Sequence, residues 1–289
     1  MDWERHQDSW PHATHSRFVF CKPHRWHVQE MGEGPLLMLI HGAGGATQSW
    51  RHLMPLLAQH YHVVAVDLPG QGFTRSGAQQ RMGLVPMAQD LTGLCLDQDW
   101  QPAVLIGHSA GAAIALEMAQ HRSPAPPVVG LNAALGTFKG LAGVLFPLMA
   151  KALAMTPWVA RLFTASTSRP GSVTRLIKGT GSDLPSEDLR WYRALVSDEA
   201  HVDGTLAMMA QWDLTPLQRA LPSHPSRTLL IVGENDRTVP PSTSRDVAAR
   251  IPDCKMMSLP GLGHLAHEEN AEAVFAAMAD FLRENAVSD

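Results

Sequence analysis

A serine stands between two glycines where an apolar run gives way to a helix-forming one. The stretch GHSAG at 107–111 follows the run 103–106 and precedes 110–120, the strand–turn–helix setting of a G-x-S-x-G motif. Glycine on either side permits a sharp turn that lifts the Ser109 hydroxyl above the sheet edge. The helix N-terminus behind it offers partial positive charge to a developing anion. The pattern predicts that Ser109 is a nucleophile.

A serine nucleophile needs a base and a carboxylate, and both follow it in the chain. Asp236 comes just after an apolar run, and His264 lies in a glycine-rich loop after the next one. In the order Ser…Asp…His, Ser109 would attack a carbonyl, His264 would take its proton, and Asp236 would hold the imidazole in the correct tautomer. Two alternatives stay open: Glu234 as the carboxylate and His267 as the base.

A second glycine-rich turn, HGAGG at 41–45, follows the apolar run 36–40. Its glycines let the backbone turn N–H groups toward a substrate. Two donors to an oxyanion are expected, the N–H of Ala110 and the N–H of Ala43. His41 is interpreted as a hydrogen-bonding brace of this loop. A phosphate site is not indicated, because neither G-K-[ST] nor G-x-G-x-x-G is present.

Short apolar runs alternate with helix-forming segments along most of the chain. The predicted strands are 18–21, 26–30, 36–40, 63–66, 103–106, 128–131, 228–232 and 255–259, and the predicted helices are 47–59, 85–96, 110–120, 242–250 and 271–284. Several runs are continuously apolar, as strands buried on both faces of a parallel sheet are. We therefore expect an α/β fold with a mostly parallel, eight-stranded sheet and helices on both faces.

The alternation breaks over 136–213, which has little strand character and several Pro and Gly interruptions. We interpret it as a helical insertion in a single core formed by 1–135 and 214–289. The insertion is rich in Met and aromatic residues. The predicted apolar substrate contacts are Phe138, Phe146, Met149, Trp158 and Trp212. Ordinary packing of the insertion and a membrane-surface face around 141–155 are the alternatives.

The composition excludes several classes of protein. Of the 289 residues, 45% are hydrophobic and 17% are charged, unlike a disordered chain. The chain has 23 Lys and Arg residues and 27 Asp and Glu residues, which gives a net charge of −4. It therefore lacks the excess of positive charge that is typical of proteins that bind nucleic acid. The 15 histidines are expected to titrate near pH 6.5 and to change the net charge just below neutrality. Three scattered cysteines indicate a reducing compartment, which we take to be the cytoplasm.

The N-terminal segment is polar, with no apolar core of a signal peptide. No apolar run reaches the roughly 18–20 residues of a membrane span. Its histidines, His6, His12, His15, His24 and His27, lack the spacing of a metal site and are interpreted as scattered surface residues. We predict no metal and no cofactor. The tail's two tryptophans, at positions 3 and 10, indicate packing onto the body or contact with a partner.

Taken in order, HGAG, DLPGQG, GHSAG, GEND and GH make the chain resemble the α/β-hydrolase superfamily over nearly its whole length outside the insertion. The resemblance implies a lid inserted after the sixth strand and ester hydrolysis by a Ser-His-Asp triad. Gln71 departs from the histidine common in the second motif, a structural turn in most members. Ser109 argues against haloalkane dehalogenase or epoxide hydrolase chemistry, which in this fold uses a carboxylate nucleophile.

Four further segments, SRFV at 16–19, WHVQ at 26–29, SWR at 49–51 and DLPGQGFT at 67–74, resemble the α/β-hydrolase-like accessory proteins of magnesium chelatase in bacteriochlorophyll biosynthesis. This implies a photosynthetic bacterium and a tetrapyrrole or the chelatase as partner. Two functions stay open. One is a serine hydrolase acting on an ester of a large apolar substrate. The other is a non-catalytic tetrapyrrole-binding or chelatase-assisting protein on the same scaffold.

Overall fold

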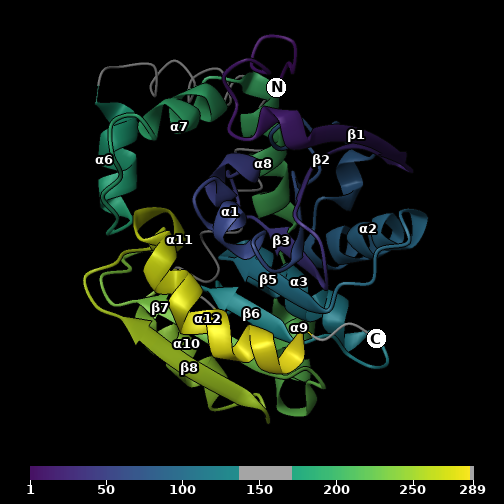
Figure 1. The fold of residues 1–289 in the computed structure, drawn as a ribbon, viewed down its shortest axis with the longest axis vertical. Helices are drawn as coiled ribbons and strands as arrows, with labels where there is room; N and C mark the ends of the chain where they lie inside the picture. Colours follow the sequence, from purple (N-terminus) through teal and green to yellow (C-terminus); the bar gives the residue numbers. More distant parts are fainter. Residues whose placement is uncertain (137–170, 287–289) are drawn as a thin grey trace.

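The computed structural model of the chain describes residues 1–136 and 171–286 (Figure 1). One eight-stranded sheet has the order β1-β2-β4-β3-β5-β6-β7-β8. The strands are β1 Ser16–Cys21, β2 His24–Met31, β3 Leu36–Ile40, β4 His62–Val66, β5 Val104–His108, β6 Val128–Leu131, β7 Thr228–Gly233 and β8 Cys254–Leu259. The β1–β2 and β2–β4 pairs are antiparallel and the other pairs are parallel. The predicted α/β fold with a mostly parallel sheet is confirmed.

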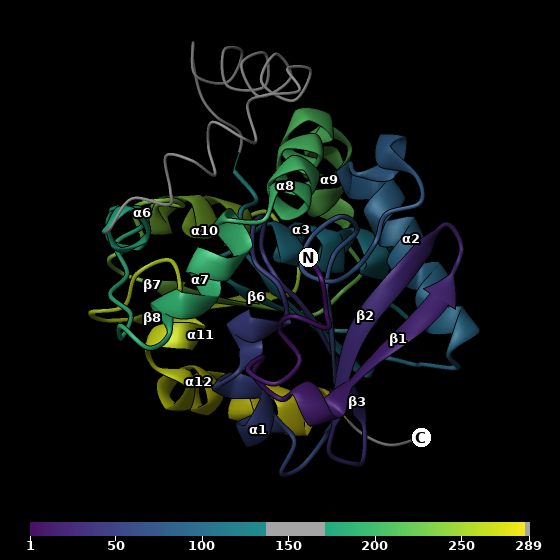
Figure 2. The same ribbon diagram turned by 90° about the horizontal axis from the view of Figure 1, so that it is seen from above.

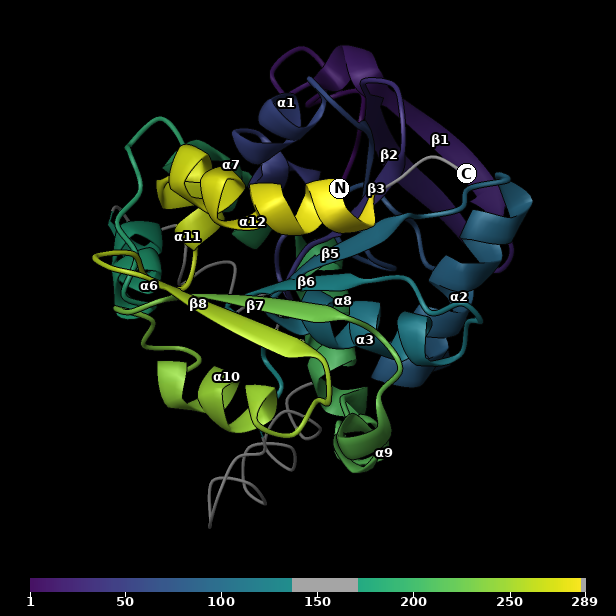
Figure 3. The same ribbon diagram turned by 60° about the horizontal axis from the view of Figure 1, so that its bottom comes forward.

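Helices cover both faces of the sheet, which is why the central strands are mostly apolar. Every residue of β3, β5, β6 and β7 is buried, whereas the edge strand β8 alternates between partly buried and exposed positions. Figure 3 shows α1 and α12 on one side of the sheet and α2, α3 and α10 on the other. These helices are α1 Leu53–Leu57, α2 Leu84–Asp97, α3 Ala110–Gln120, α10 Pro241–Ala248 and α12 Ala271–Asn285; the short α11 is Ala266–Glu269.

The predicted helix 47–59 is wrong. A 3-10 turn, η2 Thr47–Trp50, is followed by an α-helix of only five residues, α1. Pro55 has no N–H to donate to the carbonyl four residues earlier, so a continuous helix cannot pass through it. The carbonyl of Arg51 instead accepts a hydrogen bond from the His12 ring at 2.8 Å. Within residues 1–136 and 171–286, 3-10 turns also occur at η1 Ala13–His15, η3 Gln79–Arg81 and η4 Leu221–Ser223.

Between β6 and β7 the described part of the insertion is helical, with α6 Ser172–Gly179, α7 Leu189–Val196 and α8 Glu199–Gln211, followed by α9 Thr215–Ala220. We call residues 171–213 the described cap. Figure 1 shows α6, α7 and α8 at the same end of the molecule as the N-terminus, and Figure 2 shows the same arrangement from above. None of the described helices is long and apolar enough to cross a membrane.

The N-terminal tail packs onto the body, as the first of its two alternatives predicted. Trp10 is 3% exposed, and its indole N–H donates to the Thr47 hydroxyl at 3.1 Å. Its ring meets the edges of Phe73, at 4.7 Å between centroids, and of Trp191 in α7, at 5.6 Å. Trp3 packs edge-on against Phe73 at 4.9 Å. The tail therefore bridges the core and the described cap.

Two predictions about the histidines are wrong, one about their exposure and one about their titration. His24 and His27 lie fully buried in β2, not on the surface. Burial also lowers the pKa of six of the 15 histidines; the six are His24, His41, His108, His201, His224 and His267. These side chains stay neutral near pH 6.5, so the net charge changes less below neutrality than the composition alone predicts.

We expect the free energy of unfolding to fall between pH 6.5 and pH 4. In the unfolded chain these six histidines take up protons near pH 6.5, whereas in the folded protein their lower pKa keeps them neutral. The unfolded state therefore binds more protons in this window, so acid favours unfolding. Urea unfolding at pH 7, 5.5 and 4.5 measures the effect. His224→Gln should flatten the dependence and exposed His121→Gln should not; equal stability at all three pH values would contradict it.

Candidate active site

Ser109 occupies a tight turn between β5 and α3, with φ 52° and ψ −115°. Positive φ is strained for a residue other than glycine, and such strain is characteristic of functional sites. The turn is possible because glycines stand two residues before and two residues after Ser109. A Cβ at Gly107 would lie 2.3 Å from the Gly111 carbonyl oxygen, and one at Gly111 would lie 2.0 Å from that of Ile40. The Ser109 N–H donates to the Leu131 carbonyl at 2.9 Å, which fixes the turn.

The structure brings the three predicted residues into one chain of hydrogen bonds. His264 Nε2 lies 3.1 Å from Ser109 Oγ, and His264 Nδ1 lies 2.8 Å from Asp236 Oδ2. A carboxylate can only accept, so Nδ1 carries the ring proton and Nε2 is free to accept the serine proton. His264 is 6% exposed and Asp236 is 5% exposed. The geometry is that of a nucleophile, a base and a carboxylate that orients the base.

Four donors hold the Asp236 carboxylate in place. Oδ1 accepts from the backbone N–H groups of Thr238 and Val239, both at 2.8 Å, and Oδ2 accepts from His264 and from the Asn132 amide at 2.8 Å. Glu234, the alternative carboxylate, is exposed. The sequence reasoning missed Asn132, although a polar residue directly after β6 was a visible signal. The carboxyl ends of parallel strands lie at the same edge of a sheet, so Asn132, which follows β6, lies near the turn at Ser109, which follows β5.

His267, the alternative base, bonds elsewhere. Its Nε2 lies 2.8 Å from the Ser49 hydroxyl, and burial lowers its pKa to about 3. The ring of His108 separates the two candidates, with centroids 4.5 Å from His267 and 4.9 Å from His264. His108 Nε2–H donates to the His264 carbonyl at 2.9 Å and so holds the backbone of His264. Of the two histidines, the structure brings only His264 to Ser109.

Hydrogen bonds within the loop 41–45 fix the direction of the Ala43 N–H. The Gly42 carbonyl accepts from His41 Nδ1–H at 2.7 Å and from the Gly45 N–H at 3.0 Å. In a trans peptide the carbonyl and the next N–H point in opposite directions. The N–H of Ala43 therefore points away from these donors. A Cβ at Gly42 would lie 3.0 Å from the Ser109 Cβ, so the loop is next to the serine.

The register of β3 and β5 explains why Ala110, which carries the second predicted donor, lies near the loop 41–45. In the β3–β5 pair Ile40 lies opposite Gly107, so the segments that follow the two strands leave the sheet side by side. Ala110 is the first residue of α3, and the N–H groups of a helix's first turn have no acceptor within the helix. Ala110 directly follows Ser109, and Ala43 lies in the loop next to it.

A buried polar network joins the described cap to the segment after His264. Arg51 Nε donates to Asp188 Oδ1 at 3.0 Å, and Arg51 Nη1 donates to Glu268 Oε2 at 2.5 Å. The hydroxyl of Tyr192, in α7, donates to Glu268 Oε1 at 2.5 Å. Burial opposes the charge of Arg51, but Glu268 and Asp188 outweigh it and raise the pKa of the guanidinium. All of these groups are buried, so the network depends on every partner being present.

Replacing Arg51 by methionine should lower the free energy of unfolding by about 3–5 kcal/mol, because it leaves two buried carboxylates without their cation. Urea or thermal unfolding of the purified variant measures the loss. The control is Arg283→Met, which breaks a largely exposed pair with Asp280 and should leave the midpoint near that of the wild type. An Arg51→Met midpoint equal to that of the control would contradict the role given to the network.

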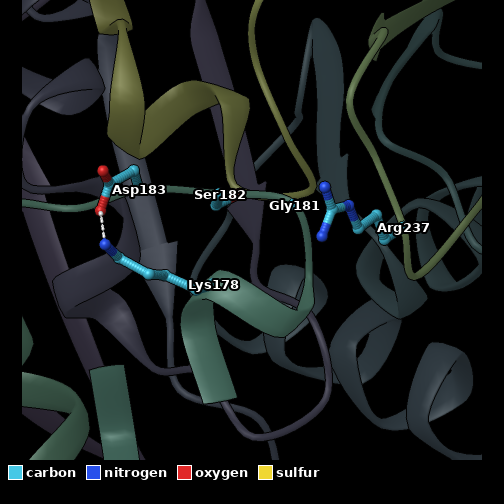
Figure 4. Close-up of a pocket in the computed structure, with 5 residues that line it drawn as sticks. All are labelled: Lys178, Gly181, Ser182, Asp183 and Arg237. Carbon is cyan, nitrogen blue, oxygen red and sulfur yellow. Dashed lines mark ion pairs between the residues drawn. The ribbon is translucent and has the colours of Figure 1, made fainter. Parts of the chain in front are cut away.

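A surface hollow lies between the described cap and the loop that contains Arg237, the residue after Asp236 (Figure 4). It is lined by Lys178, Gly181, Ser182, Asp183 and Arg237. The Ser182 hydroxyl accepts from the Leu265 N–H at 2.8 Å, and the Arg237 N–H donates to the Thr180 carbonyl at 3.0 Å. The described cap thus supports the residues that follow His264 and Asp236. None of the three residues of the hydrogen-bonded chain lines the hollow.

Of the predicted apolar substrate contacts, Phe138, Phe146, Met149 and Trp158 lie outside the described residues, as does the segment 141–155. Trp212 directly follows α8 and is partly buried against the core cluster under α2 and α3. In the part of the chain that the structure describes, no group of three or more His, Cys, Asp or Glu side chains could hold a metal ion.

Comparison with known proteins gives the family. Residues 37–277 match the model of the "Alpha/beta hydrolase family". The chain is 42% identical to the "Magnesium-chelatase 30 kDa subunit" of Rhodobacter capsulatus, over 95% of this chain and 96% of that one. It is 28% identical to the "Pimeloyl-[acyl-carrier protein] methyl ester esterase" of Xanthomonas oryzae, over 89% and 98%.

Comparison with solved structures gives the same fold. A solved α/β-hydrolase-fold protein from Burkholderia ambifaria superposes with a TM-score of 0.74 at 22% identity, covering 92% of this chain and all of that one. The resemblance to the superfamily, and the closer one to the magnesium-chelatase-associated relatives, are both confirmed. The chain therefore belongs to the alpha/beta hydrolase family.

Proposed function

We propose that the protein is a serine hydrolase that cleaves a carboxylic ester. The observation that carries the proposal is the unbroken hydrogen-bonded chain from Ser109 through His264 to Asp236. This order of nucleophile, base and orienting carboxylate, on a strained turn at a helix N-terminus, suits acyl transfer.

The reaction would run in two halves. Ser109 Oγ attacks the ester carbonyl while His264 Nε2 takes the serine proton, and the N–H groups of Ala43 and Ala110 donate to the oxyanion. As the tetrahedral intermediate collapses, His264 returns the proton to the departing alcohol and an acyl-enzyme remains. Water then attacks this ester, again losing a proton to His264. The carboxylic acid leaves, and Ser109 regains its proton.

For the substrate we propose a large apolar ester, of the kind found among the tetrapyrroles of bacteriochlorophyll biosynthesis. Two relatives support this class. One carries the name of a magnesium-chelatase subunit and is 42% identical, and the other is named as a methyl ester esterase. The Met-rich and aromatic composition of the insertion suits a broad apolar surface.

The second candidate is a non-catalytic protein that binds a tetrapyrrole or assists magnesium chelatase. The identity to the relative from Rhodobacter capsulatus favours it, because that relative is named for the chelatase and not for hydrolysis. A fold can keep its site residues while serving another role.

One experiment separates the two. Purified protein is incubated with protoporphyrin dimethyl ester and, separately, with p-nitrophenyl acetate, beside the Ser109→Ala variant. The hydrolase proposal expects acid release from at least one ester by the wild type and none by the variant. Visible-spectrum titration with a magnesium porphyrin runs in parallel. Binding by both proteins without turnover by either would favour the second candidate and overturn the first.

A further inference from the structure

One face of α8 lies against the loop 41–45 and the turn 67–72. The residues of this face are His201 and the residues three, four and seven positions after it, Gly204, Thr205 and Met208. Gly204 permits a close approach, since a Cβ there would lie 2.1 Å from the Gly70 carbonyl oxygen. The side-chain amide of Gln71 lies 3.2 Å from Met208 Sδ. The described cap therefore rests directly on the segments that lead into the candidate site.

His201 joins two of these segments by hydrogen bonds from its two ring nitrogens. The Gly72 N–H donates to His201 Nδ1 at 2.9 Å, and His201 Nε2 lies 3.2 Å from the Gly44 carbonyl oxygen. A backbone N–H can only donate and a carbonyl can only accept, so the proton sits on Nε2. The bridge needs the neutral imidazole. Burial lowers the pKa of His201 to about 4, which keeps the ring neutral at pH 7.

Gly44 is held on both sides as a result. Its carbonyl accepts from His201, and its N–H donates to Gln71 Oε1 at 2.7 Å. Gly44 has φ 76°, a conformation that glycine adopts readily and other residues do not. It directly follows Ala43, whose N–H is the proposed oxyanion donor. Holding Gly44 in place therefore restricts the backbone at Ala43 and, with it, the direction of the Ala43 N–H.

We propose that His201 is a positioning residue of the reaction: from the cap helix α8 it bridges Gly44 and Gly72 and so holds the Ala43 N–H in place for the oxyanion. The inference rests on the proposed hydrolase function. An oxyanion donor contributes chiefly to the transition state, so a displaced loop should lower kcat more than it raises KM.

The test compares two substitutions of His201 with a matched one elsewhere. His201→Leu removes the bridge, whereas His201→Gln keeps one donor and one acceptor in the side chain. The control is His224→Leu, because His224 is buried and also bridges a carbonyl, that of Leu116, to an N–H, that of Ser226. Each variant is assayed for kcat and KM on p-nitrophenyl acetate, for labelling by a fluorophosphonate, and for amide hydrogen exchange.

We expect His201→Leu to lower kcat by about 10- to 100-fold with a smaller change in KM, and the Gly72 amide to exchange faster. It should still be labelled at Ser109, since the nucleophile and base remain. His201→Gln should recover most of kcat, and His224→Leu should keep it. An active wild type beside an unimpaired His201→Leu, or an equal loss in His224→Leu, would overturn this inference alone. A wild type with neither turnover nor labelling would overturn the proposed function, and the inference with it.

Discussion

Replacing Ser109 by alanine is expected to lower kcat for ester hydrolysis by about 10⁶-fold, the scale of loss when the serine of such a triad is removed. Alanine keeps the backbone turn but leaves His264 Nε2 with no hydroxyl to deprotonate, because Ser109 Oγ is its partner at 3.1 Å. KM should change little, since a hydroxyl contributes little to binding the ground state. Steady-state kinetics on p-nitrophenyl acetate measure both constants.

The matched control is Ser226→Ala, which removes another buried hydroxyl, two residues before β7 and at the end of that strand opposite Asp236. It should retain the wild-type kcat. Unfolding curves of both variants separate lost chemistry from lost folding, and Ser109→Ala should unfold as a single, wild-type-like transition. Turnover by Ser109→Ala within tenfold of the wild type would exclude a serine nucleophile at this position.

Replacing Asp236 by asparagine is expected to lower kcat by about 10⁴-fold. Asp236 Oδ2 accepts the Nδ1 proton of His264 at 2.8 Å, and this bond selects the tautomer whose Nε2 is free to act as a base. Asparagine can turn its N–H toward Nδ1, which moves the ring proton to Nε2. That nitrogen then donates toward Ser109 and cannot accept the serine proton.

Glu234→Gln is the control, because Glu234 is the other acidic residue in the loop after β7 and its side chain is exposed. It should leave kcat near the wild-type value at neutral pH. A large loss in Glu234→Gln beside an active Asp236→Asn would reverse the assignment of the carboxylate. The pH profile adds a second measurement, since Asp236→Asn should recover activity as pH rises and hydroxide assists the reaction.

The parts of the site that the sequence could predict are those with local signals. Ser109, Asp236 and His264 each follow a predicted strand, and the carboxyl ends of parallel strands meet at one edge of a sheet. The sequence alone therefore predicts that their side chains lie together. The sheet was predictable for the same reason, because strands buried on both faces contain few polar residues.

The parts that could not be predicted depend on contacts between distant segments. Arg51 bonds Glu268 across 217 residues, and His201 bonds Gly72 across 129. No spacing motif in the sequence identifies such pairs. Each polar residue can be buried only because its distant partner satisfies its hydrogen bonds. The expected helix 47–59 failed for a local reason, the proline at position 55, whose effect on the hydrogen-bond pattern is visible in the sequence.

Covalent capture shows whether Ser109 is an activated nucleophile. The protein is treated with a fluorophosphonate and digested, and the modified peptide is identified by mass spectrometry. We expect one phosphonyl group per chain, on Ser109, with the rate of labelling reduced in His264→Ala and unchanged in exposed His121→Ala. An unlabelled protein, or a label on any other residue, would contradict it.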